Sequence, residues 1–270
     1  MFSDYIQKIK EDGIVKIDNF LTEKELESAK KIIRYYSAPK GHENSYFPVK
    51  IKSIFSKLLE LNFKKIKNSF FILNLANKKK LNLISNYFFN QKSSLEFVDG
   101  YYSKISNKEV LPWHTDQAYR GAEKLSEGFV NPNHFFLKIF IYLTNVGPNN
   151  GCTSYIPKSQ KIGYAIRKGI YEGKLKYQPY WKLKDFRKLI LNKENKDYFI
   201  NYFNGSSLID NFLEQTALVE KEENFESSEF DFNLSAGSAI IFDEGGVHKG
   251  SKTLLNDRMV MRYMYSIKEY

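Results

Sequence analysis

Residues 236–248 read AGSAIIFDEGGVH, a glycine turn followed by an apolar run and then by a histidine at the far end of that run. A short apolar run bounded by glycines is typical of a buried strand. Similar blocks recur from residue 95 onward, with period-two alternation and breaks at Gly, Pro and Asn. We therefore predict strands at 96–105, 110–116, 135–143, 152–156, 229–234, 238–243 and 258–267. This series is typical of an antiparallel barrel or sandwich.

Helical patterns surround this predicted strand region. Residues 13–20 alternate in strand fashion, and Thr22 to Glu25 then offer a capping box for a helix through about Tyr35. Apolar spacing over 49–93 predicts further helices, which we expect to cover one face of a sheet. The long segment 161–228 contains helical patches at 185–191 and 208–218, and we expect it to form a lid.

Composition limits the class of protein. The 270 residues include 42% hydrophobic and 16% aromatic residues, which is enough for one large core. The single cysteine, Cys152, forbids an intrachain disulfide or a thiolate zinc cluster, and it favours a reducing, cytoplasmic location. No signal peptide is visible, and the most apolar stretch, 135–143, is too short to span a membrane.

The net charge of +10 comes from 41 basic and 31 acidic residues. Such an excess could indicate nucleic acid, an anionic surface or an acidic substrate. Because the lysines are spread and arginine is scarce, a nucleic-acid partner is not expected.

The stretch LPWHTDQ, residues 111–117, carries the first chemical motif. Residues i and i+2 of a strand point to the same face, so His114 and Asp116 should project into one cavity. With His248 from the opening stretch, they would make the two-histidine, one-carboxylate set of Fe(II) oxygenases, which leaves positions open for a co-substrate and O2. The other histidines, His42 and His134, fit neither motif.

An anionic 2-oxo acid on this iron would need a cation at the inner end of the barrel. Arg258 and Arg262 share one face of the last strand, and parity does not choose between them. Arg262 lies roughly 13 Å further along that strand, so Arg258 is the better candidate, with a shared role for Arg262 left open. Parity also places Lys138 and Tyr142 inside the barrel, where they would touch co-substrate or substrate, unless the lysine only snorkels at a strand edge.

The chain resembles the phytanoyl-CoA dioxygenase family of Fe(II)/2-oxoglutarate oxygenases almost from end to end. The similar blocks are DGIVKIDNFLT (12–22), LKIFIYLTNV (137–146), NNGC (149–152), IPKSQK (156–161) and the two histidine stretches. The turn at 156–161 departs from the family pattern, because Lys158 and Gln160 replace its usual Gly and His. The resemblance implies His114, Asp116 and His248 as iron ligands and Arg258 as the partner of the distal carboxylate of 2-oxoglutarate.

The same resemblance implies the fold. We expect a mainly β protein with flanking helices, built as one domain over 1–270. Its core would be a double-stranded β-helix (a jelly roll, cupin-like), with the 161–228 segment as a helical insertion.

The expected reaction is hydroxylation of a C–H bond in a polar or anionic small molecule, with release of succinate and CO2. The retained carboxylate of Asp116 separates this chain from related halogenases, which carry a small residue there. Basic residues of the predicted lid, among them Arg167, Lys182 and Arg187, would recognise the anionic group. Trp113, Gln117 and Tyr119 flank the metal motif and could line the substrate mouth.

Three alternatives remain at the sequence level. An oxygenase of the same type could perform desaturation, epimerisation or oxidative cleavage instead of hydroxylation. A cupin-like metal protein or isomerase could use the same ligands without redox chemistry. A basic protein associated with nucleic acid, or an oxygenase acting on a macromolecule, is the third.

Overall fold

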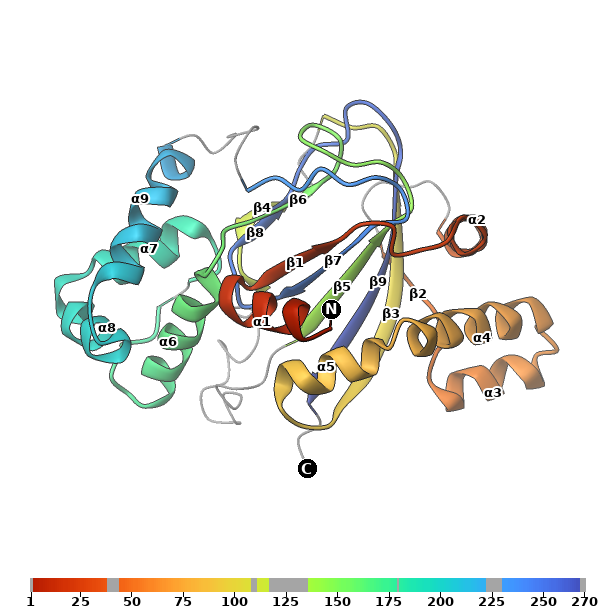
Figure 1. Cartoon of the computed structure of the whole chain (residues 1–270), viewed down its shortest axis with the longest axis horizontal. Helices are drawn as coiled ribbons and strands as arrows, with labels where there is room; N and C mark the ends of the chain where they lie inside the picture. The colour runs from red at the N-terminus through yellow and green to blue at the C-terminus, as the bar shows by residue number, and fades with distance from the viewer. Residues whose placement is uncertain are drawn as a thin grey trace.

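The computed structural model describes residues 2–37, 44–107, 111–116, 136–178, 180–221 and 230–267. These residues form two antiparallel sheets and two groups of helices (Figure 1). Within them the helices contain more residues than the strands. The fold is therefore mixed, and the expected "mainly β" class is wrong, because several period-two blocks yield strands of only three or four residues.

The larger sheet has six strands in the order β1-β7-β5-β9-β3-β2. In that order they are β1 (Ile14–Ile17), β7 (Ala239–Asp243), β5 (Leu137–Tyr142), β9 (Arg258–Ile267), β3 (Ser93–Ser103) and β2 (Asn44–Tyr46). All neighbours are antiparallel, and β5 is buried along its whole length between β7 and β9. The strands predicted for β1, β3, β5, β7 and β9 are confirmed, whereas β2 was not expected.

The smaller sheet has three strands in the order β4-β8-β6: β4 (Leu111–His114), β8 (His248–Gly250) and β6 (Thr153–Tyr155). His114 is the direct cross-strand partner of His248. The three-residue strand β8 is too short for a periodic signal, and it was missed. Of the strand predicted at 229–234, the described residues 230–234 form only isolated bridges, Ser154 to Asp231 and Val146 to Leu234.

The described residues of the first half of the chain form the helices α1 (Phe2–Asp12), α2 (Glu23–Tyr36), α3 (Ile51–Leu59), α4 (Phe63–Lys78) and α5 (Leu81–Phe89). All except α3 contribute to a large apolar core with the outer face of the larger sheet. The predicted capping box of α2 is confirmed, since the Thr22 hydroxyl accepts from Glu25 N and the Glu25 carboxylate accepts from Thr22 N. The helix α1 was not predicted.

The predicted parity of β5 is also confirmed. Ile139 and Ile141 pack in the core beneath the helices, whereas Phe140 and Tyr142 lie in a second core with residues of both sheets. The ring of Phe140 is 5.0 Å from that of Phe242. The inward face of β5 therefore lines the space between the sheets.

The second group of helices comprises α6 (Ser159–Tyr171), α7 (Leu183–Leu191), the 3-10 turn η2 (Lys193–Asn195), α8 (Lys196–Phe203) and α9 (Ser207–Lys221). They form their own apolar core beside the smaller sheet (Figure 1). Trp113 and Val247 belong to that core, so the Trp113 side chain contributes to packing. Among the described residues, no helix combines the length and apolarity needed to cross a membrane.

Candidate metal centre

The two motif histidines meet where β4 and β8 pair. Their ring centroids are 4.5 Å apart. His114 Nδ1 lies 2.6 Å from Pro112 O, and His248 Nδ1 lies 2.8 Å from Gly246 O. Donation to these carbonyls keeps the proton on Nδ1, which leaves the lone pair of each Nε2 for a metal.

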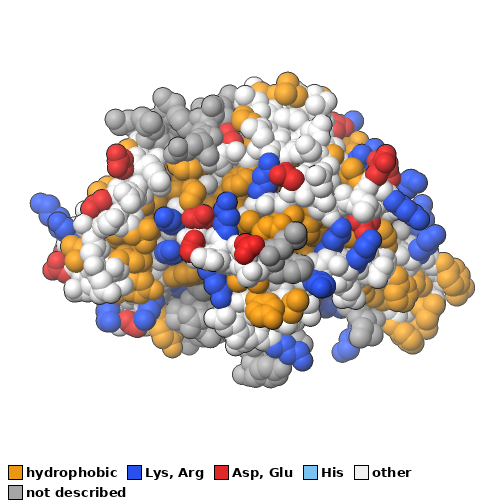
Figure 2. All heavy atoms as spheres, in the orientation of Figure 1, with side chains coloured by type: hydrophobic (Ala, Val, Ile, Leu, Met, Phe, Trp, Pro, Cys, Tyr) orange, Lys and Arg blue, Asp and Glu red, His pale blue; other side chains and the backbone are white. Residues whose placement is uncertain are grey.

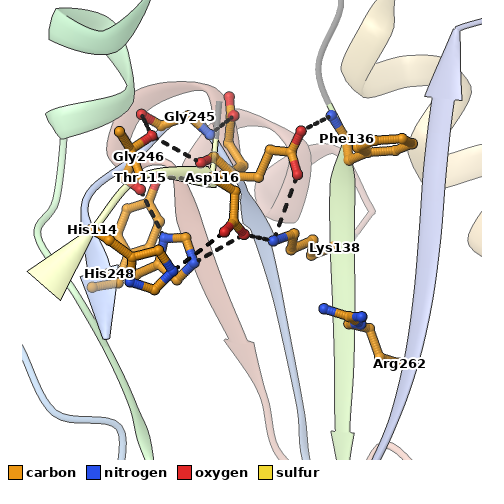
Figure 3. Close-up of polar contacts among 12 residues, drawn as sticks. His114, Thr115, Asp116, Phe136, Lys138, Gly245, Gly246, His248 and Arg262 are labelled. Atoms are coloured by element: carbon orange, nitrogen blue, oxygen red, sulfur yellow. Dashed lines mark hydrogen bonds and ion pairs between the residues drawn. The ribbon is translucent and has the colours of Figure 1, made fainter. Parts of the chain in front are cut away.

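Asp116 completes the group, as the i, i+2 spacing predicted. It lies just beyond the end of β4, with Oδ1 3.3 Å from His114 Nε2 and Oδ2 3.4 Å from His248 Nε2. Thr115 points the other way, and its hydroxyl donates to the carbonyls of Glu244 and Gly245 (Figure 3). One ligand atom from each of His114, Asp116 and His248 lies within 4.8 Å of the others.

Burial keeps both imidazoles neutral. Desolvation lowers the pKa of His114 to about 4 and the pKa of His248 well below its usual range. His114 Nε2 is buried without a hydrogen-bond partner among the described residues. A buried polar atom of this kind is normally paired, and a divalent metal ion would pair it.

Lys138 lies on the opposite side of Asp116 from the histidines (Figure 3). Its ammonium contacts Asp116 Oδ2 directly and lies 3.6 Å from Glu244 Oε2. The Phe136 N–H donates to the other oxygen of Glu244, 3.1 Å away. Burial lowers the pKa of Lys138 to about 8, with Glu244 opposing that shift. The described ion pairs of this lysine are thus with a candidate metal ligand and a buried acid.

Arg258 and Tyr142 lie together at the other end of the inner space. The guanidinium carbon of Arg258 is 5.7 Å from the Tyr142 ring and 5.9 Å from the Tyr101 ring. The Tyr142 hydroxyl is 2.6 Å from Thr153 Oγ1. Arg258 is only 4% exposed, and among the described residues no carboxylate lies within ion-pairing distance of it. Its buried Nε has no hydrogen-bond partner there either.

Arg262 has a different environment. Its Nε and Nη2 donate to the two carboxylate oxygens of Asp99, at 2.8 and 2.5 Å. Asp99 is fully buried and directly opposite Arg262 in the sheet. Because this bidentate pair satisfies Arg262, Arg258 is the arginine that retains unused hydrogen-bonding capacity.

Residues 9–257 match the sequence profile of the family described as phytanoyl-CoA dioxygenase (PhyH). The chain belongs to the phytanoyl-CoA dioxygenase family. This membership confirms the resemblance noted in the sequence, together with the Fe(II)/2-oxoglutarate oxygenase class that it implies. No curated protein sequence matches the chain.

Solved structures with the same fold include other 2-oxoglutarate-dependent proteins. HygX from Streptomyces hygroscopicus, with iron bound, aligns with a TM-score of 0.55 at 14% identity over 99% of this chain and 87% of that one. The 2-oxoglutarate-dependent epimerase SnoN of nogalamycin biosynthesis aligns with a TM-score of 0.53 at 12% identity, over 98% and 83% of the two chains. At such identities the likeness shows a shared fold alone.

In this phytanoyl-CoA dioxygenase family member, two of the predicted substrate-binding cations have other surroundings. Arg187 is buried and donates to Leu213 O and Thr216 Oγ1, so it ties α7 to α9. Arg167 is also buried. The backbone of Lys182 does lie beside the metal motif, because it forms an isolated antiparallel β-bridge with the backbone of His114. Predictions for His42, His134, Gln117 and Tyr119 fall outside the described residues.

Sequence reasoning missed four side chains near the site of this family member: Asp99, Glu244, Asp243 and Tyr164. Asp243 is buried, accepts from Gly245 N at 2.8 Å and from the Tyr164 hydroxyl, and burial raises its pKa to about 8. Asp243 ends the buried strand and Glu244 follows it, four residues before His248, and these acids at the strand end were the available signal.

Proposed function

We propose that the protein is an Fe(II)- and 2-oxoglutarate-dependent dioxygenase that hydroxylates a C–H bond of a polar or anionic small molecule. The observation that carries this proposal is the convergence of His114, Asp116 and His248, with ligand atoms within 4.8 Å of one another. Two neutral imidazoles and one carboxylate suit Fe(II) and leave coordination positions open. The orphaned Nε2 of His114 supports the same assignment.

We further propose that the two sheets form a double-stranded β-helix, or jelly roll. The support is connectivity: from β3 to β9, each successive strand lies in the other sheet from the one before it. This alternation winds the chain around one inner space with the candidate ligands at its wall. We assign residues 1–270 to one domain, in which helices of the 161–228 segment form the lid.

When bound, iron, 2-oxoglutarate and O2 supply the oxidising power, and 2-oxoglutarate leaves as succinate and CO2. Arg258 would hold the distal carboxylate of 2-oxoglutarate through its planar fork, with Tyr142 beside it. The charges support this role. Glu244 neutralises the positive charge of Lys138, and Asp99 neutralises that of Arg262. Fe(II) bound to the Asp116 carboxylate would carry one net positive charge. That charge and the Arg258 cation would together balance a dianionic co-substrate.

Lys138 would act as a positioning residue in this scheme. Its ammonium contacts the Asp116 carboxylate and is itself held by Glu244. Such a partner fixes the orientation of a ligating carboxylate. Whether Lys138 also contacts substrate is part of the proposal, because its strand lines the inner space.

The substrate class rests on the surroundings of the site. Lys182 lies in the lid segment beside the metal motif, where it could pair with an anionic group. HygX of the same fold has been crystallised with nickel, 2-oxoglutarate and hygromycin B bound, a small-molecule complex that suits such a lid. The single cysteine supports action in the cytoplasm.

Epimerisation is the alternative outcome at the same centre. It is favoured by the fold shared with the epimerase SnoN and with SnoK, described as a 2-oxoglutarate-dependent carbocyclase (TM-score 0.52, 12% identity). Product analysis by mass spectrometry separates the two outcomes, since only hydroxylation adds one oxygen atom.

The first test is an anaerobic titration of metal-free protein with Fe(II) and then 2-oxoglutarate. We expect the weak visible charge-transfer band of the iron chelate in the wild type and its loss in His114→Ala. Succinate release on exposure to O2 should accompany the band. Iron binding without the band and without succinate would contradict the oxygenase proposal and favour a non-redox metal protein.

A further inference from the structure

The α3–α4 hairpin carries the densest exposed apolar surface of the described chain. Within 55–70, six large apolar side chains are 45–75% exposed: Phe55, Leu58, Leu59, Leu61, Phe63 and Phe70. The buried residues of α4 are confined to 69–76, where that helix meets the core. The turn between the helices therefore points away from the sheets (Figure 1).

The same hairpin is strongly basic. Residues 50–67 contain six lysines and one acid, Glu60. Glu60 is itself paired with Lys57, at 2.7 Å. Figure 2 shows orange apolar and blue basic side chains gathered together at this end of the molecule. An exposed apolar patch rimmed by like charges is unusual on a monomer and marks a binding surface.

A groove beside the hairpin extends the positive charge. It lies between α2 and α4, has a volume of about 720 Å³, and is lined by four cations and no acid. The cations are Lys31, Arg34, Lys64 and Lys67. Tyr35 and Phe71 also line it, and Lys64 lies 4.4 Å above the Tyr35 ring.

We propose that this surface docks on an anionic phospholipid membrane. The apolar side chains at the turn, Leu58 to Phe63, would enter the acyl boundary, and the groove cations would hold lipid phosphates. The convex, protruding shape favours insertion into lipid over a flat protein interface. The exposed leucines and phenylalanines likewise favour lipid over nucleic acid, which would leave them in water.

The test is co-sedimentation of the full chain with phosphatidylcholine vesicles and with vesicles that also contain phosphatidylglycerol. We expect binding to the anionic vesicles only, weakening with added salt. Each cation at such a surface contributes about fivefold to partitioning. Replacing Lys31, Arg34, Lys64 and Lys67 by Gln should therefore weaken binding by up to about 600-fold.

Two matched controls separate specific docking from general charge. The first replaces four exposed lysines at the opposite end by Gln: Lys184, Lys188, Lys193 and Lys196. It should bind like the wild type. The second compares the triple Ser variant of Leu59, Leu61 and Phe63 with a Leu254→Ser, Leu255→Ser variant, and only the hairpin variant should lose binding.

Insertion has a separate readout. The added fluorescence of Leu61→Trp, relative to wild type, should be quenched by brominated acyl chains. Equal binding of the hairpin variants and wild type, or no binding to anionic vesicles, would overturn the proposal. So would light scattering that shows a dimer broken by the triple Ser variant, or tighter binding to a DNA or RNA oligomer than to vesicles. None of these results depends on the proposed oxygenase reaction.

Discussion

Replacing Arg258 by methionine should have opposite effects on stability and on co-substrate binding. Arg258 is 4% exposed, lies between the rings of Tyr101 and Tyr142, and has no carboxylate partner among the described residues. Methionine keeps much of the apolar contact of the side-chain stem and removes the charge. The free protein then no longer has to bury an uncompensated cation.

The two magnitudes follow from this environment. Removing a buried, unpaired charge should stabilise the metal-free protein by about 1–3 kcal/mol. Truncating one partner of a buried charge pair costs about 2–5 kcal/mol in binding, so affinity for 2-oxoglutarate should fall between about 30-fold and several thousand-fold. Iron affinity in the absence of 2-oxoglutarate should change little.

Denaturant unfolding and the anaerobic 2-oxoglutarate titration measure these two effects. The matched control is Arg262→Met, which strands the fully buried carboxylate of Asp99 and should destabilise the fold by about 3–5 kcal/mol. Our reasoning is refuted if Arg258→Met also lowers stability by several kcal/mol, or if it leaves 2-oxoglutarate affinity unchanged.

Four further predictions concern other parts of the molecule. His114→Ala should weaken Fe(II) or Co(II) binding more than about hundredfold in calorimetry, and an unchanged affinity would remove it from the metal site. Lys138→Met should cost about 3 kcal/mol in denaturant unfolding, because it strands buried Glu244, and adding Glu244→Gln should restore part of that loss. Because burial raises the pKa of Asp243 to about 8, the folded state holds a proton that the unfolded state releases above about pH 4, and stability is lost as pH rises. The free energy of unfolding of the wild type should therefore fall with pH by up to about 1.4 kcal/mol per pH unit more than that of Asp243→Asn between pH 5 and 7. If the two proteins lose stability in parallel over this range, Asp243 is ionised in the folded state. Thr22→Ala should lower the free energy of unfolding by about 1 kcal/mol through loss of the α2 cap, whereas Ser28→Ala on the exposed face should have a smaller effect.

The fold was predictable wherever local periodicity was long. The strands β3, β5, β7 and β9 and the capped helix α2 all followed from spacing or from a cap motif. The short strands β2 and β8 were missed, whereas β6, which is equally short, was predicted as the block at 152–156. The mixed fold class was missed because the helices contain more residues than the strands, and some of them, such as α1, were not predicted.

The candidate metal site was predictable in its members because each motif is local. Two-residue parity placed His114 and Asp116 on the same face of a strand. His248 ends the motif at 236–248, just after the strand β7. The charge partners around them were not predictable. Glu244 is 106 residues from Lys138, and Arg262 is 163 residues from Asp99.

The sequence by itself determined which side chains share a face, because backbone geometry sets the two-residue period of a strand whatever surrounds it. It also determined the metal-ligating motif and, through it, the family. Distance along the last strand already favoured Arg258 over Arg262, but only the tertiary structure shows what each arginine contacts. Those contacts depend on the register of β3 against β9, which places Asp99 opposite Arg262 and leaves Arg258 beside two tyrosines. Register depends on how the buried faces and turns of neighbouring strands fit together, so the two-residue parity of one strand does not fix it.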